Sequence, residues 1–227
     1  MTPATLVLAR HGRTPWHEEN RYTGSSDIGI DEVGTEQATN LASWAGVSPP
    51  DALYASGLQR AMATAAPVAE LLGLQLETDD RLREMHFGIA EGHTLDDLRV
   101  THPAEVARFE ADPAAHPLPG SEDPHEAADR GVEVLDGIAA AHGGHTVLVV
   151  CHNTLIRLVL CRYLGIPLGG YRTVLHGVAP TSAARLTVAG GKARLLSYNE
   201  DPRAAFSGGR EHHSGATASA TPPEHAP

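Results

Sequence analysis

The stretch HTVLVVCHN, residues 145–153, decides the fold, because a run of apolar residues in it ends abruptly at polar ones. A shorter run of the same kind, TLVLA over residues 5–9, ends at Arg10 and His11. Continuous apolar runs of this length are typical of strands that are covered on both faces. In open α/β sheets the ligand binds at the carboxyl ends of the parallel strands. Arg10, His11 and His152 follow such ends and are therefore candidate site residues.

Helices and further strands are expected to alternate around these two strands. Residues 57–73 carry leucine, methionine or alanine at every third or fourth position, which predicts an amphipathic helix. The other expected helices are 32–45, 123–142 and 154–164, and the other expected strands are 52–55, 75–78, 183–188 and 193–198. This alternation predicts an α/β fold, a three-layer α/β/α sandwich with a mostly parallel central sheet.

Length and composition exclude several classes of protein. The chain has 227 residues, of which 41% are hydrophobic, and this is enough for one domain with a buried core. Its formal net charge of -11 argues against nucleic acid as a partner. No apolar run is long enough to cross a membrane, and the start of the chain lacks a secretory signal pattern, so we expect a cytoplasmic protein.

The cysteines and the end of the chain are expected to carry no chemistry. Cys151 and Cys161 lie in apolar surroundings without a C-x-x-C spacing, which predicts core thiols and neither a disulfide nor a metal site. Small and turn-forming residues dominate from 202 onward, so we expect a domain over 1–201 and a disordered tail over 202–227. Adjacent histidines at 212 and 213 are either a metal-binding pair or without function.

Arg10 and three further residues fit an anion site. Arg10 carries a permanently charged fork that matches phosphate oxygens, and Gly12 would let the backbone approach a ligand. Arg60 falls in the first turn of the helix expected at 57–73, where the helix N-terminus favours anions. Glu84 becomes a proton donor if it faces a phosphate. Taken singly, each residue also fits a structural role on the surface or in the core.

Four motifs in order resemble the histidine phosphatase superfamily, also called the phosphoglycerate mutase-like family. They are R-H-G at 10–12, S-x-x-x-R-A-x-x-T-A at 56–65, L-R-E-x-x-F-G-x-x-E-G at 82–92 and V-V-C-H at 149–152. The resemblance runs from about residue 5 to about residue 198, and one such motif alone would be weak. It implies a metal-independent phosphomonoesterase without a cofactor.

The resemblance also implies a role for each matching residue. His11 would be the nucleophile that takes up the phosphoryl group, and Arg10, Arg60 and His152 would hold its oxygens. Glu84 would be the acid and base. A small phosphorylated metabolite would then be hydrolysed through a phosphohistidine, in two displacements that need alignment and charge stabilisation.

Two residues depart from the family pattern and one adds a contact. His17 stands where many family members have asparagine, so its contact to the substrate would be altered. Asn153 follows His152 where glycine is usual, and it could instead cap the helix at 154–164. Thr23 matches a loop around the phosphate, although a turn threonine explains it equally well. We therefore include Thr23 and His17 as substrate-binding residues.

The branch of the family determines whether the phosphohistidine gives its phosphoryl group to water, as in a phosphatase, or to a second acceptor, as in a mutase. The interval from Glu84 to His152 is short beside that of the glycolytic mutases, and residues 117–123 resemble a segment of the smaller phosphatases. A more open pocket admits water, so we predict a phosphatase. Phosphoglycerate mutase-type transfer and a catalytically silent phospholigand-binding regulatory protein remain the alternatives, whereas no H-E-x-x-H spacing supports zinc.

The substrate itself is not ranked by the sequence. We expect residues 93–125 to form a lid whose loops carry specificity. Arg13, Arg21 and Arg83 are candidates for contacts to a second anionic group. The resemblance suggests sugar phosphates, phosphoglycerate derivatives and nucleotide-loop phosphates, and neither these nor the oligomeric state can be resolved from the residues.

Overall fold

A single six-stranded sheet forms the centre of the protein, whose computed structural model describes residues 2–204. The strands are β1 (Ala4–Arg10), β2 (Ala52–Ala55), β3 (Leu76–Thr78), β4 (Thr146–Cys151), β5 (Ala183–Ala189) and β6 (Lys192–Glu200). Their order is β3-β2-β4-β1-β5-β6. The four strands from β3 to β1 are parallel, and β5 and β6 run antiparallel. The expected strands and the mostly parallel sheet are confirmed.

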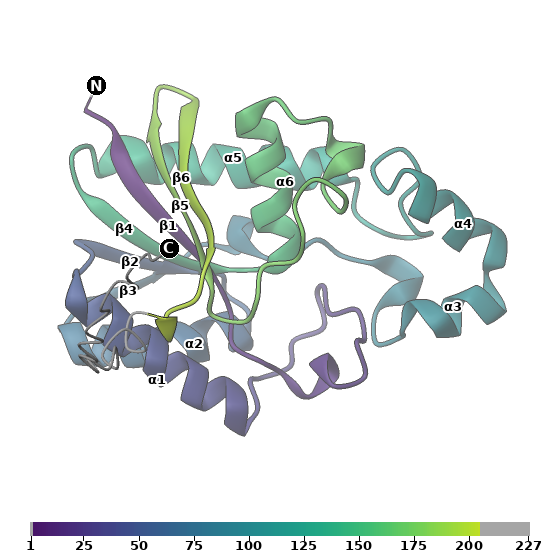
Figure 1. The fold of residues 1–227 in the computed structure, drawn as a ribbon, viewed down its shortest axis with the longest axis horizontal. Helices are drawn as coiled ribbons and strands as arrows, with labels where there is room; N and C mark the ends of the chain where they lie inside the picture. The colour runs from purple at the N-terminus through teal and green to yellow at the C-terminus, as the bar shows by residue number, and fades with distance from the viewer. Residues whose placement is uncertain (1, 205–227) are drawn as a thin grey trace, which may run out of the picture.

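Four long helices cover the two faces of the sheet (Figure 1). They are α1 (Glu32–Val47), α2 (Gln59–Leu72), α5 (Pro124–Ala141) and α6 (Asn153–Leu164). Alternate residues of β1 face opposite layers: Val7 packs with the α1 and α2 residues, and Leu8 packs with those of α5 and α6. Both faces of the strand are therefore buried, which explains why its sequence is continuously apolar.

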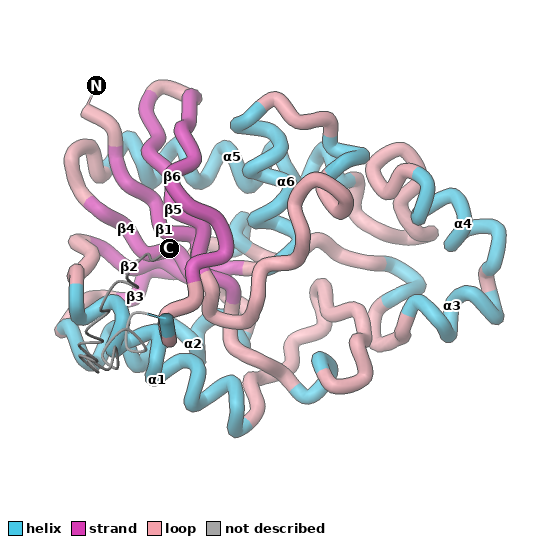
Figure 2. Tube along the Cα trace, in the orientation of Figure 1, coloured by secondary structure: helices cyan, strands magenta, loops and turns pink. Residues whose placement is uncertain are grey.

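The segment expected to be a lid contains two short helices that were not predicted from the sequence. Residues 93–125 contain α3 (Leu95–Thr101) and α4 (Pro103–Ala111). The Thr94 hydroxyl accepts from the Asp97 N–H and caps α3, and Pro103 begins α4. Figure 2 shows long loops between this helical pair and the end of the sheet.

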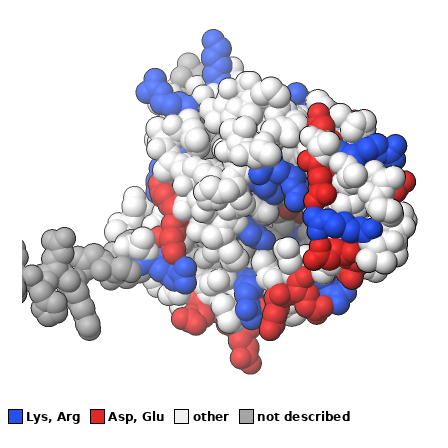
Figure 3. All heavy atoms as spheres, turned by 45° about the vertical axis from the view of Figure 1, so that its right-hand side comes forward, with Lys and Arg blue, Asp and Glu red and all other residues white. Residues whose placement is uncertain are grey.

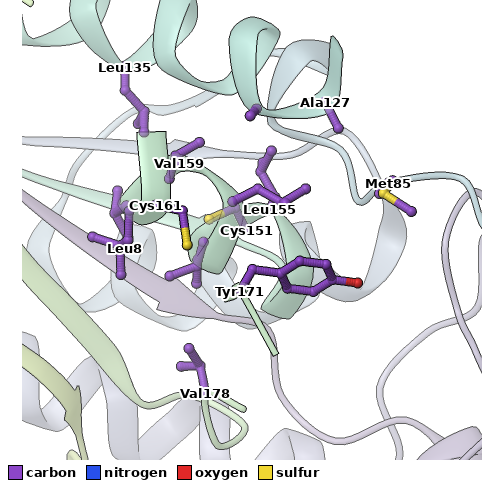
Figure 4. Close-up of a cluster of buried hydrophobic side chains, with 14 of the residues drawn as sticks. Leu8, Met85, Ala127, Leu135, Cys151, Leu155, Val159, Cys161, Tyr171 and Val178 are labelled. Atoms are coloured by element: carbon purple, nitrogen blue, oxygen red, sulfur yellow. The ribbon is translucent and has the colours of Figure 1, made fainter. Parts of the chain in front are cut away.

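The two cysteines lie inside the larger apolar cluster, as the sequence predicts. Cys151 and Cys161 are buried and unpaired, among side chains such as Leu155 and Val159 (Figure 4). Burial raises the pKa of Cys151 to about 12, because the charged thiolate is disfavoured away from water. Both thiols therefore belong to the core.

The sheet has a topological switch point between its two central strands. The parallel neighbours β1 and β4 lead into helices on opposite faces, β1 toward α1 and β4 toward α6. Such divergence opens a crevice at the carboxyl ends of the strands. Arg10 and His11 at the end of β1 therefore lie beside His152 at the end of β4.

The described part of the chain ends shortly after β6, at residue 204. The Ala204 N–H donates to the Asp201 carbonyl, and the rest of the expected tail, with the histidines at 212 and 213, lies outside the described residues. Within residues 2–204 no helix combines the length and the apolar character needed to span a bilayer.

Candidate active site

A pocket of about 310 Å³ opens beside the carboxyl ends of β1 and β4. Its size is that of a site for a small molecule. Figure 3 shows arginine side chains gathered around a hollow on this face, with acidic side chains nearby. The pocket is lined by Arg10, His11, His17, Asn20, Arg21, Tyr22, Thr23, Glu84, Phe87, Leu95, Asn153, Thr154, Arg157, Tyr171 and Arg172.

His11 has one ring nitrogen available to the pocket. Its Nδ1 lies 2.7 Å from the Gly12 carbonyl, which can only accept, so Nδ1 carries the proton and Nε2 keeps its lone pair. Burial, followed by the charges of Arg10 and Arg60, holds the pKa of His11 well below its usual value. The ring is therefore neutral at pH 7, as a nucleophile must be.

The loop after β1 is held by α1 and α2. The Gly12 N–H donates to the Thr64 hydroxyl at 2.9 Å, and that hydroxyl donates to the Arg60 carbonyl at 2.6 Å. A Cβ at Gly12 would lie 2.7 Å from the Gly34 carbonyl oxygen. The close contact with Gly34 of α1 is therefore enough to require glycine at this position.

Arg60 is completely buried and faces the loop that contains Thr23. Its Nη1 donates to the Ser26 carbonyl at 2.8 Å, and its Nη2 donates to the Gly24 carbonyl at 2.7 Å. Burial lowers its pKa, with Glu84 acting in the opposite direction. These bonds fix the guanidinium while they leave its Nε without a partner.

Glu91 organises that same loop, a role that the sequence did not reveal. Its carboxylate accepts from the backbone N–H groups of Gly24, Ser25 and Ser26, and from the Ser26 hydroxyl at 2.6 Å. The loop carbonyls are thereby turned toward Arg60. Glu91 is the second glutamate of the L-R-E-x-x-F-G-x-x-E-G motif at 82–92, and only its contacts in the structure show its role.

His152 is the N-cap residue of α6 and is fully buried. Its ring lies 5.2 Å from that of His11, centroid to centroid. Burial, followed by the charge of Arg60, holds its pKa well below the usual value. Both of its ring nitrogens lack a hydrogen-bond partner.

The unpartnered buried atoms concentrate in this site. Within residues 2–204, six buried side-chain nitrogen or oxygen atoms have no hydrogen-bond partner, and four of them belong to Arg10, Arg60 and His152. An unpaired buried polar group is costly, and folded proteins contain few of them. The cluster therefore indicates a place prepared for a hydrogen-bonding ligand.

Glu84 presents a buried carboxylate at the start of α6. Its Oε1 accepts from the N–H groups of Met85 and Leu155, both at 3.0 Å, and its Oε2 accepts from that of Thr154 at 2.9 Å. These three bonds orient the carboxylate, which lines the same pocket as His11. Glu84 and His11 therefore line one cavity.

Arg10 and His17 each direct a hydrogen-bond donor toward the other. The Thr14 N–H donates to His17 Nδ1 at 3.0 Å, so the neutral ring carries its proton on Nε2. That nitrogen lies 2.5 Å from Nη2 of Arg10, which also only donates. Burial and Arg10 lower the pKa of His17 to about 4, and burial lowers that of Arg10 to about 10.

Thr23 and Asn153 fit the expectations only in part. Thr23 lines the pocket, but its hydroxyl donates to the Arg21 carbonyl at 3.3 Å, as in a turn. Asn153 begins α6 without being its N-cap, because His152 occupies that position. The Asn153 side chain instead accepts from the Val178 N–H at 2.9 Å.

The arginines expected near a second anionic group mostly lie elsewhere. Arg13 pairs with Asp31 at 2.8 Å and Arg83 pairs with Glu122 at 3.0 Å, and neither lines the pocket. Only Arg21 of the three does. Of the segment expected to be a lid, Leu95 alone lines the pocket.

Sequence reasoning missed several lining residues, among them Arg157, Tyr171 and Arg172. A signal existed for Arg157, which is a charged residue inside the apolar run TLIRLVL of α6. No comparable signal marks the other two. Between residues 2 and 204, no group of three or more histidine, cysteine, aspartate or glutamate side chains is arranged to hold a metal ion.

Comparisons with known proteins agree with this geometry. The model of the histidine phosphatase superfamily (branch 1) matches residues 6–201. Phosphoserine phosphatase 1 of Hydrogenobacter thermophilus is 29% identical over 166 residues, which are 73% of this chain and 79% of that protein. The metal-independent phosphoserine phosphatase of Arabidopsis thaliana is 32% identical over 161 residues, with coverages of 69% and 67%.

A solved structure extends the similarity to three dimensions. The native structure of mycobacterial glucosyl-3-phosphoglycerate phosphatase matches with a TM-score of 0.79 at 27% identity. The match covers 87% of this chain and 99% of that one.

Proposed function

Because this chain belongs to the histidine phosphatase superfamily, we propose that it hydrolyses a small phosphomonoester through a phosphohistidine on His11. The observation that carries the proposal is the cluster of unpartnered buried atoms on Arg10, Arg60 and His152. Arg10 lines the pocket with His11, and the His152 ring lies 5.2 Å from the His11 ring, whereas Arg60 and His152 are fully buried and are not among the lining residues. We propose that their unpartnered atoms donate to phosphoryl oxygens. We assign the activity to a domain over residues 1–201.

The meeting of Arg10 and His17 supports the same ligand. Two donors that face each other repel, and one oxygen atom that accepts from both removes the conflict. A phosphoryl oxygen is such an acceptor, and it would turn an unfavourable contact into two hydrogen bonds. His17 would thus contact the phosphate through Nε2, in place of the family's asparagine. Thr23 would add only a contact at the edge.

The first step transfers the phosphoryl group to the enzyme. Nε2 of neutral His11 attacks phosphorus, the bond from phosphorus to the ester oxygen breaks, and Glu84 gives its proton to the departing oxygen. Arg10 and Arg60 supply fixed positive charge for the equatorial oxygens. The incoming anion also favours a protonated His152, which would then donate to it.

The second step returns the enzyme to its starting state. The Glu84 carboxylate takes a proton from a water molecule, whose oxygen attacks the phosphohistidine, and the bond from phosphorus to Nε2 breaks. His11 is released as a neutral ring together with inorganic phosphate. The guanidinium groups provide the positive charge for both steps, so no metal or cofactor enters the proposal.

The alternative of mutase-type transfer differs only in the acceptor of the second step. In that case an alcohol would replace water, and phosphate would be released slowly. Relatives are named for phosphoserine and for glucosyl-3-phosphoglycerate, so these two metabolites are the first substrates to try. We propose a cytoplasmic location and neither a nucleic-acid nor a membrane partner.

An alkaline-quench experiment tests the proposal. The protein is mixed with a radiolabelled aryl phosphate in EDTA, denatured in alkali, and examined for an acid-labile label on His11. We expect labelled protein, release of phosphate to water, and loss of both in His11→Asn. Turnover that persists in His11→Asn without any labelled protein would refute the phosphohistidine mechanism.

A further inference from the structure

Arg157 is a buried cation in the pocket that the proposed steps do not use. It lies on α6, is 8% exposed, and lines the same cavity as His11 and Glu84. Its Nε donates to the Asn153 carbonyl at 3.3 Å. It forms no ion pair with any acidic side chain in the part of the chain that the structure describes, so its charge is not neutralised by a carboxylate.

Arg130, a largely buried arginine outside the pocket, differs from Arg157 in having a carboxylate partner. It pairs with Glu122 at 2.7 Å and donates to the Arg83 carbonyl at 2.8 Å. Buried charges are ordinarily paired because desolvation is costly. An arginine that stays unpaired and faces a cavity is therefore a candidate ligand-binding group.

The Arg157 guanidinium is held in place by an aromatic ring. Its Cζ lies 5.0 Å from the centroid of the Tyr171 ring, which is 1% exposed. Figure 4 shows that ring in the apolar cluster, near Leu155 and Cys151. Stacking on a fixed ring orients the planar fork and preserves its donors for a ligand.

A second arginine stands at the rim of the same pocket. Arg172 donates from Nη1 to the Tyr22 hydroxyl at 2.8 Å, and its Cζ lies 4.9 Å from the Phe109 ring. Burial lowers the pKa of Arg157, and the charge of Arg172 acts in the same direction. Both guanidinium groups line the same cavity, so an anion bound there would accept from both.

The position of these arginines in the pocket indicates which part of the substrate they would contact. Glu84, which protonates the leaving oxygen in the proposed mechanism, is bound by the N–H groups of Thr154 and Leu155, at the start of the helix that carries Arg157. The same carboxylate attracts Arg157 electrostatically. A leaving group that takes its proton from Glu84 would therefore lie near the first turns of α6, which carry Arg157, in the pocket that Arg172 also lines.

We infer that Arg157 and Arg172 bind a second anionic group on the departing part of the substrate. The inference rests on the phosphatase function proposed above and names its substrate class. The substrates are small phosphomonoesters that carry a carboxylate or a second phosphate in addition to the phosphoryl group that is transferred. Guanidinium forks match either anion with two hydrogen bonds.

Matched substrates test the inference. Phosphoserine and phosphoethanolamine differ only by a carboxylate, and ethylene glycol bisphosphate offers a second phosphate instead. Phosphoserine and ethylene glycol bisphosphate each carry a second anionic group. We expect kcat/KM of the unaltered protein for at least one of these two esters to exceed that for phosphoethanolamine by roughly tenfold or more. Whichever ester is preferred identifies the second group.

Substitutions test whether Arg157 and Arg172 cause this preference between the esters. Arg157→Gln and Arg172→Gln should reduce that ratio to about one, and Arg157→Lys should retain part of it because the charge remains. Arg162→Gln is the control on the same helix, since Arg162 pairs with Asp129 outside the pocket, and it should leave the ratio unchanged. Arg172 lies at the surface, so its substitution tests the idea without risk to the core.

The outcomes separate this inference from the proposed function. Equal kcat/KM values for all three esters in a protein that still hydrolyses an aryl phosphate would overturn the second subsite alone. A uniform loss for every ester in Arg157→Gln and Arg172→Gln would also overturn it, since the arginines would then be structural. Absence of both aryl phosphate turnover and labelled His11 would instead overturn the phosphatase.

Discussion

Replacement of Glu84 by glutamine separates the two roles of its carboxylate. Glu84→Gln keeps the volume of the side chain but exchanges one oxygen for an NH₂ group. The amide oxygen can still accept from Met85 and Leu155, whereas the amide nitrogen then faces the N–H of Thr154. Loss of this buried acceptor should lower the free energy of unfolding by about 1–3 kcal/mol, as measured by urea denaturation.

The catalytic effect should depend on the leaving group. An alkyl alkoxide needs a proton as it departs, whereas a nitrophenolate does not. Loss of a general acid costs roughly 10²- to 10⁴-fold in rate, so phosphorylation of Glu84→Gln by an alkyl phosphate should slow by that factor. Its phosphorylation by nitrophenyl phosphate should change only a few-fold.

Rapid mixing measures the first step by itself. The burst of nitrophenol reports transfer to His11, while the steady-state rate also contains the attack of water, which Glu84→Gln should slow for every substrate. Glu122→Gln is the matched control, because Glu122 is a buried carboxylate that binds Arg130 outside the pocket. Equal slowing of the first step for alkyl and aryl esters in Glu84→Gln would refute the role of Glu84 as acid.

Three further predictions concern phosphate binding, acid stability and a turn. His17→Ala should raise the inhibition constant of inorganic phosphate about tenfold, the value of one hydrogen bond to a charged group, and an unchanged constant would contradict that contact. The pKa of His17 is about 4 when folded and 6.5 ordinarily, so the unfolded state binds its proton first as the pH falls. The unfolding free energy should therefore drop by about 3 kcal/mol between pH 7 and pH 4 from this group, and a flat profile in denaturation experiments would contradict it. Gly88→Ala should cost about 2 kcal/mol or more, because φ is 55° and the new Cβ would lie 2.1 Å from the Pro119 oxygen; in a thermal melt Gly137→Ala, in open space on α5, should not destabilise.

The strands and long helices of this protein could be predicted from local patterns. The run at 147–151 is apolar at every position because helices cover both faces of β4, and the sequence records that burial directly. The short helices α3 and α4 escaped prediction. Their segment is rich in charge and proline, and its helical character depends on caps at Thr94 and Pro103 that lie among many other turn-forming residues.

The sequence by itself determined the α/β class, the order of the elements and the candidates His11, Arg60, Glu84 and His152, since periodicity and motif order are properties of the chain. Only the tertiary structure decided which charges remain available. Arg13 and Arg83 find acidic partners far away in the chain, whereas Arg157 finds none among the described residues and faces the pocket. The physical reason is that pairing and desolvation depend on distance in space, and that distance is set only when the sheet brings the ends of β1 and β4 together.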